Sequence, residues 1–109
     1  MERTPATIVV LEEHAAAQEL IEEALREAGD RVLLTNNPME IIGLATRVRI
    51  DLLVTDIDAL ESTEPKLAEK LRSIAPVLQI GGQDGLRAPF SLQELQDAVS
   101  LALDRQTAG

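Results

Sequence analysis

Short apolar runs recur along this chain of 109 residues and are separated by longer stretches that mix apolar and polar positions. Runs of four to eight apolar residues without helical spacing are typical of strands that are covered on both faces of a parallel sheet. The clearest such run, Leu52 to Thr55, lies between Asp51 and Asp56. The pattern predicts strands at 6–11, 31–35, 51–55 and 77–80.

Between these runs the apolar residues recur every three or four positions, which is the spacing of one buried helix face. The first such stretch begins at Ala15 and is followed by Gly29, a residue type that commonly ends a helix. Two later stretches open on capping signals, at Asn37 and at Ser91, each with a glutamate three residues after the cap. The pattern predicts helices at 15–28, 38–47, 62–74 and 92–103, with a loop at 57–61.

Strands and helices alternate along the whole pattern. This order predicts an α/β fold in which a doubly wound parallel sheet has right-handed crossovers and helices on both faces. The length fits a single domain over residues 1–109. Residues 83–90 are too few to hold a further helix and a further strand together, so we expect this part of the fold to be truncated.

Charge and composition narrow the class of protein. The formal net charge is -9 and Phe90 is the only aromatic residue, so the chain lacks the excess of cations and the stacking side chains that nucleic-acid binding uses. The chain has no cysteine, which excludes disulfides and thiolate metal sites. No signal-peptide pattern is present, and no apolar stretch approaches the ~18 to 20 residues that span a bilayer. We therefore expect a cytoplasmic protein without nucleic-acid or membrane partners.

Several motifs, in order and at consistent intervals, resemble one known family. Residues 51–57 are similar to a strand that bears a phosphoacceptor aspartate, which falls on Asp56, and Glu12 and Glu13 stand where that family has metal-binding acids. Further matches are Leu20, Ile21, Leu25, Gly29, the strand at 76–80 and Ala88-Pro89-Phe90, which is similar to a Lys-Pro-Phe motif without its lysine. From Ile8 to Leu103 the chain thus resembles the receiver domain of bacterial two-component response regulators, which implies a flavodoxin-like fold.

The acids define a candidate site. Glu12, Glu13 and Asp56 follow strands whose carboxyl ends meet at one edge of a parallel sheet, where ligands of such folds collect. Three carboxylates brought together repel one another unless a cation neutralises them, and Mg²⁺ accepts one or two carboxylates while it keeps its waters. We predict these three residues as ligands of a weak Mg²⁺ site, with Asp56 as candidate phosphoacceptor and no other cofactor. The alternative is that the acids are solvated remnants of an ancestral site.

Departures from the family pattern bear on function. Gly81 stands where the family has Thr or Ser, and Ala88 stands in place of the lysine, so two groups that would contact a phosphoryl group are missing. Arg87 is one position away, and adjacent side chains of a regular strand point to opposite faces. The resemblance therefore implies an atypical receiver domain that is not an enzyme and acts, without phosphorylation, as a signalling and protein-interaction module. The alternative is a phosphoacceptor that uses Asp56 with Mg²⁺ held by the two glutamates.

The shortened region also predicts an interaction surface. Loss of the family's fourth helix and much of its fifth strand would bare apolar side chains from Val77 to Ile80, and an exposed apolar patch of this kind marks an interaction site. We expect a second copy of the chain, in a homodimer, or a histidine kinase or other signalling protein to cover it. The alternative is that the helix at 62–74 shifts to cover the gap. A nucleotide-binding enzyme is disfavoured because no glycine-rich loop follows the first strand.

Overall fold

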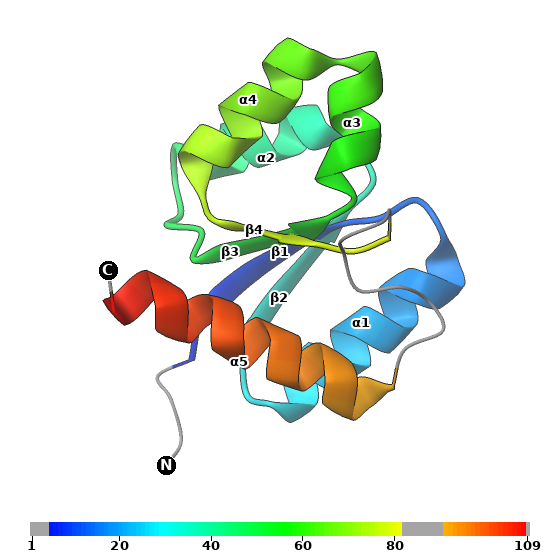
Figure 1. Cartoon of the computed structure of the whole chain (residues 1–109), viewed down its shortest axis with the longest axis vertical. Coiled ribbons are helices and arrows are strands. Elements are labelled where there is room, and N and C mark those ends of the chain that lie inside the picture. The colour runs from blue at the N-terminus through cyan, green and yellow to red at the C-terminus, as the bar shows by residue number, and fades with distance from the viewer. Residues whose placement is uncertain (1–4, 82–90, 109) are drawn as a thin grey trace.

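The computed structural model describes residues 5–81 and 91–108. Strands and helices alternate through most of these residues (Figure 1). The strands are β1 (Thr7–Leu11), β2 (Arg31–Thr35), β3 (Leu52–Thr55) and β4 (Val77–Gln79), and the helices are α1 (Ala15–Glu27), α2 (Pro38–Ala45), α3 (Ile57–Thr63), α4 (Pro65–Ile74) and α5 (Leu92–Ala108). None of the helices in this part of the chain has both the length and the apolar composition that crossing a bilayer requires.

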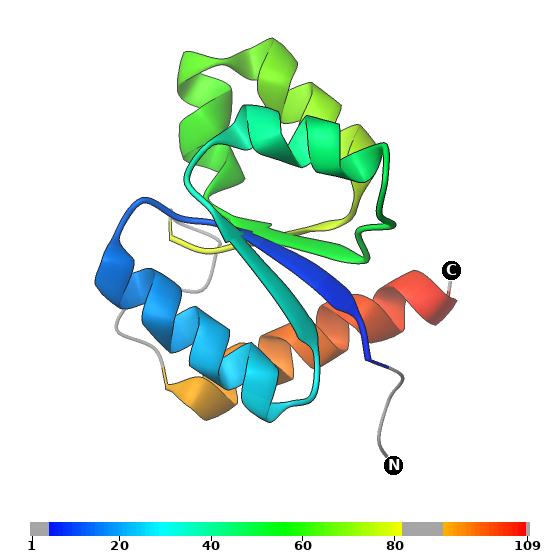
Figure 2. The ribbon, with the colours of Figure 1, turned by 180° about the vertical axis from the view of Figure 1, so that it is seen from behind.

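The described strands form one parallel sheet in the order β2-β1-β3-β4. β1 and β3 lie in the middle, and the view from behind shows β2 at one edge of the sheet (Figure 2). Every residue of β3 is buried, as expected for a central strand whose apolar run does not alternate with polar residues. The predicted parallel α/β sheet is confirmed.

Two layers of helices cover the sheet. α1 and α5 lie on one face, and α2, α3 and α4 lie on the other (Figures 1 and 2). Alternate residues of the central strands point to opposite layers: Ile8 and Leu52 belong to the core on the α1 and α5 side, whereas Val9 and Leu53 belong to the core on the α2, α3 and α4 side. The sheet is therefore doubly wound, with one apolar core on each face.

The loop predicted directly after β3 is wrong, because these residues form α3. The Asp56 side chain caps this helix by accepting a hydrogen bond from the backbone N–H of Ala59 at 3.1 Å. Pro65 then separates α3 from α4, since proline lacks an N–H and disfavours helical geometry in the residue before it. That residue, Glu64, has φ -140° and ψ 72°. The chain between β3 and β4 therefore holds two short helices where the sequence predicted one.

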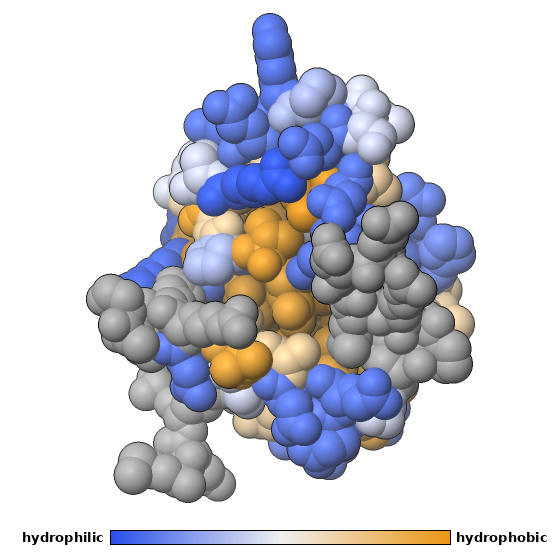
Figure 3. Space-filling view, in the orientation of Figure 1, coloured by the Kyte–Doolittle hydropathy of each residue, from blue (hydrophilic) through white to orange (hydrophobic). Residues whose placement is uncertain are grey.

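β4 is less exposed than the sequence predicted. Val77 is half-buried against the core on the α2, α3 and α4 side, and Leu78 is half-buried against the core on the other side. Ile80, directly after the strand, is only 5% exposed. The helix layers on both faces thus cover much of β4. Figure 3 shows the apolar surface that remains over β4 and continues onto α5, where Leu101 is 53% exposed. We call Val77, Leu78 and Leu101 the β4–α5 strip.

Candidate functional site

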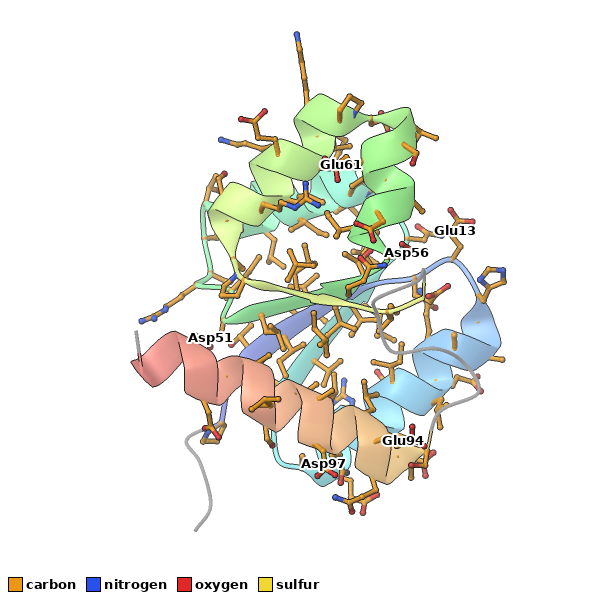
Figure 4. All side chains as sticks on the ribbon, in the orientation of Figure 1. Glu13, Asp51, Asp56, Glu61, Glu94 and Asp97 are labelled. Atoms are coloured by element: carbon orange, nitrogen blue, oxygen red, sulfur yellow. The ribbon has the colours of Figure 1, made fainter. Side chains whose placement is uncertain are left out.

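A crevice of about 570 Å³ opens at the carboxyl ends of β1 and β3. The acidic and basic residues in its described lining are Glu12, Glu13, His14, Asp56 and Glu64. The parallel sheet therefore brings the three predicted site acids to one crevice, at the edge where ligands of such folds collect. Figure 4 shows Asp56, at the start of α3, and Glu13, after β1, at this same end of the sheet.

The Asp56 carboxylate is half-buried and is held by the protein itself. Its Oδ1 accepts the capping hydrogen bond from the Ala59 backbone and a second, shorter one from Gln79 Nε2 at 2.7 Å. The register of the sheet explains this contact, because Gln79 pairs with Thr55, the residue before Asp56. Gln79 was not among the predicted site residues. The signal available in the sequence was its polarity within the otherwise apolar run from Val77 to Ile80.

The Gln79 side chain uses its amide oxygen as well as its amide nitrogen. Oε1 accepts hydrogen bonds from the backbone N–H groups of Ile57 at 2.9 Å and Asp58 at 3.3 Å. These two N–H groups belong to the first turn of α3, where backbone donors lack partners within the helix. Nε2 also lies within hydrogen-bond distance of the carbonyl oxygens of Ile80 at 3.1 Å and Gly81 at 3.2 Å. Gln79 therefore joins the end of β4 to both Asp56 and the start of α3.

Gly81 leaves no free space for a side chain beside Asp56. Its φ is +77°, in the left-handed region that glycine adopts readily and other residues avoid. A Cβ built on Gly81 would stand 3.1 Å from Asp56 Oδ2. A Thr or Ser, which the resemblance to receiver domains assigns to this position, would be strained in this backbone conformation and crowded against Asp56.

Glu12 is engaged with its neighbour His14. Its Oε1 lies 2.9 Å from His14 Nδ1 and also accepts from the His14 backbone N–H at 3.1 Å. The Glu12 side chain is 17% exposed, whereas the His14 side chain is 82% exposed. The hydrogen bond to Glu12, followed by the negative charge of Glu12, raises the pKa of His14 above its ordinary value. Glu13 is exposed.

The residues present do not fit a preformed Mg²⁺ site. Within 5–81 and 91–108, no three His, Asp or Glu side chains form a group that could hold a metal ion. Three described contacts agree with this finding, because Glu12 is paired with His14 and Asp56 Oδ1 is hydrogen-bonded to two protein donors. The weak Mg²⁺ site at Glu12, Glu13 and Asp56 therefore stays a prediction without support from this geometry, as does the role of Asp56 as phosphoacceptor.

Only one of the predicted departures from the receiver pattern after β4 falls on a described residue. Gly81 is described, whereas Arg87 and Ala88 lie outside the described residues. The described lining of the crevice contains no lysine or arginine. Its only basic side chain in this part of the chain is His14, at the rim after β1.

Comparison with known proteins relates the fold to one class. No protein-family model and no curated protein matches the sequence. Among solved structures, a response regulator from Thermotoga maritima superposes with a TM-score of 0.77 at 21% identity, over 93% of this chain and 99% of that one. The chemotaxis response regulator CheY4 of Vibrio cholerae gives 0.69 at 15% identity, over 92% and 100%. A response regulator receiver domain protein from Bacillus halodurans gives 0.67 at 20% identity, over 91% and 97%.

The chain therefore has the fold of response regulator receiver domains. The predicted resemblance, the flavodoxin-like fold and its shortening relative to a full receiver domain are confirmed. At these levels of identity the likeness establishes the fold alone.

Proposed function

We propose that this chain works as a single receiver-like domain, over residues 1–109, that takes part in signalling through protein contacts and without phosphorylation of Asp56. The receiver fold supports a role in signalling. The departures from the usual phosphoacceptor site, described above, support a mode of action that does not depend on the phosphoryl group. The proposed activity is binding, with no reaction catalysed.

The charge of the crevice is the observation that carries this proposal. Its described lining has four carboxylates, those of Glu12, Glu13, Asp56 and Glu64, and no lysine or arginine. A phosphoryl group on Asp56 would add negative charge among these acids. Phosphoryl transfer relies on positioning and on positive groups or metal ions that neutralise the developing charge. The described part of the crevice offers no preformed metal site and no lysine or arginine.

Phosphorylation is expected to fail under conditions that modify an ordinary receiver domain. After incubation with acetyl phosphate and Mg²⁺, the mass of the intact protein should be unchanged, because the described crevice has no lysine, arginine or preformed metal site to balance the charge of the transferred group. Intact-protein mass spectrometry at neutral pH measures this directly. A response regulator with a complete site, treated in parallel, shows that the donor is active.

The Asp56→Asn variant separates this proposal from its alternative. Asparagine keeps an oxygen that can accept from Ala59 and Gln79 but removes the nucleophilic carboxylate. A phosphoryl mass that appears on the wild-type protein and is absent from Asp56→Asn would contradict the proposal. That result would favour the phosphoacceptor receiver in which Glu12 and Glu13 hold Mg²⁺.

The β4–α5 strip is the surface that we propose for the protein contacts, with a second copy of the chain as its partner. Apolar surface gathers over β4 and continues onto α5, with polar surface above and below it in the view of Figure 3. Leu101 is the most exposed apolar side chain of the strip, at 53%. Burial of such side chains between two copies would stabilise a homodimer at about 25 cal/mol per Å² of apolar surface. A histidine kinase or another signalling protein is the alternative partner.

Self-association is expected to weaken when Leu101 is replaced by glutamate. The added carboxylate would have to be buried at the interface, where an unpaired charge is strongly unfavourable. Sedimentation velocity over micromolar concentrations should show a dimer for the wild-type protein and a monomer for Leu101→Glu. Met39→Glu is the matched control, since Met39 is 60% exposed on α2, away from the strip. A wild-type protein that stays monomeric at all these concentrations would contradict the dimer.

A further inference from the structure

Gln79 donates a hydrogen bond to Asp56 Oδ1, an oxygen that a metal ion bound to this carboxylate could use as a ligand. We propose that the Gln79 amide is a built-in substitute for a metal ion at this carboxylate and that it keeps divalent cations off the site. The inference rests on the proposed function and deepens it, by naming the residue that competes with a metal ion for the Asp56 carboxylate. The likeness to receiver domains does not by itself predict this role for Gln79.

The contact between Gln79 and Asp56 would compete directly with a metal ion for the Asp56 carboxylate. Gln79 Nε2 donates to Asp56 Oδ1 at 2.7 Å, and the Ala59 backbone N–H donates to the same oxygen at 3.1 Å. Hydrogen bonds to an ionised acceptor are the strong ones. Mg²⁺ would need the lone pairs of this oxygen at a much shorter distance. The donor hydrogens already point at Oδ1 and carry positive charge, so an approaching cation meets both competition and repulsion.

Further contacts of the Gln79 amide hold it beside Asp56. Gln79 Oε1 accepts from the backbone N–H groups of Ile57 and Asp58, while Nε2 also lies near the carbonyl oxygens of Ile80 and Gly81. To make way for an ion, the side chain would have to leave these partners as well as Asp56. Two donors of the α3 first turn would then need another acceptor. The Gln79 amide is therefore held in place by contacts with the end of β4, Asp56 and the start of α3.

Neutral replacement of Gln79 is expected to create Mg²⁺ binding. Gln79→Met keeps a side chain of similar length but removes the amide donor and acceptor. With MgCl₂ as the only added ligand, the melting temperature of Gln79→Met should rise with Mg²⁺ concentration, since a ligand that binds only the folded state stabilises it. We expect at least about tenfold tighter Mg²⁺ binding than in the wild-type protein, a difference that corresponds to the loss of one strong competing contact.

Two controls make the result specific. Gln93 Nε2 donates to Asp97 Oδ1 at 2.8 Å on the exposed surface of α5, so Gln93→Met breaks a glutamine–aspartate bond of nearly the same length away from the crevice. Its Mg²⁺ response should equal that of the wild-type protein. Adding Asp56→Asn to Gln79→Met should abolish the new response, because the charge that attracts the ion is gone.

A second variant protects the test against loss of folding. Gln79→Glu keeps the oxygen that accepts from Ile57 and Asp58 but places a second carboxylate against Asp56, so its folded state should depend on Mg²⁺ even more strongly. Folding that Mg²⁺ restores supports the inference. Equal Mg²⁺ responses in wild type and Gln79→Met overturn it, as does the absence of any response in both Gln79 variants. No phosphodonor is present in this experiment, so its failure is distinct from a failure of the proposed function, which the mass measurement reads separately.

Discussion

Leu53→Ala is expected to lower the free energy of unfolding by about 2–5 kcal/mol, the range for truncating a large aliphatic side chain in a packed core. Leu53 is 0% exposed and lies in the core beneath α2, α3 and α4. β3 is a central strand with partners on both sides, so the sheet has little freedom to close the cavity. Urea denaturation followed by circular dichroism measures the change.

The same substitution at Leu52 tests the opposite face of the sheet. Leu52 is also 0% exposed but belongs to the core on the α1 and α5 side. Leu52→Ala should therefore destabilise the protein as strongly as Leu53→Ala, about 2–5 kcal/mol. Leu33→Ala is the control, since Leu33 lies on the edge strand β2 with 40% exposure, and it should cost about 1 kcal/mol or less. If Leu52→Ala cost no more than Leu33→Ala, the sheet would lack its second covered face.

Gly81→Ala is expected to destabilise the protein by about 2–4 kcal/mol, which is the left-handed backbone penalty plus the crowding of the new methyl group. The added Cβ would stand 3.1 Å from Asp56 Oδ2. The carboxylate cannot move away freely, because its Oδ1 is bonded to Ala59 and Gln79. Equilibrium unfolding in urea gives the value.

Gly29→Ala isolates the second contribution. Gly29 also has a positive φ, +93°, but a Cβ there would meet no atom within 4 Å. It should therefore show only the backbone penalty, about 1–2 kcal/mol. Equal losses for the two variants would mean that Asp56 yields easily to a side chain at position 81. In that case only the left-handed backbone conformation would disfavour a Thr or Ser at position 81.

The sheet was the most predictable part of the fold. Apolar runs without helical spacing predicted four strands, and all four strands of the described sheet lie within the predicted ranges. Only the edge strand β2 is largely exposed. The helix directly after β3 was not predictable in this way. Its first-turn donors are satisfied by Asp56 and by Gln79, and Gln79 is 23 residues away from Asp56 in sequence.

The candidate site was likewise predictable only in part. Parallel strands bring their carboxyl ends to one edge, so the sequence order alone placed Glu12, Glu13 and Asp56 around one crevice. Which atoms those acids contact depends on the pairing of β3 with β4 and on side-chain conformations, and neither follows from residue spacing. The positive φ of Gly81 depends likewise on how the chain leaves β4.

Asp56 also has a structural role that is independent of phosphate chemistry. By capping α3 it satisfies a backbone donor, and loss of such a cap costs about 0.5–2 kcal/mol. A folded protein therefore has a structural reason to keep an acidic or amide residue at this position. An aspartate retained after the third strand is, by itself, no proof of phosphoryl transfer.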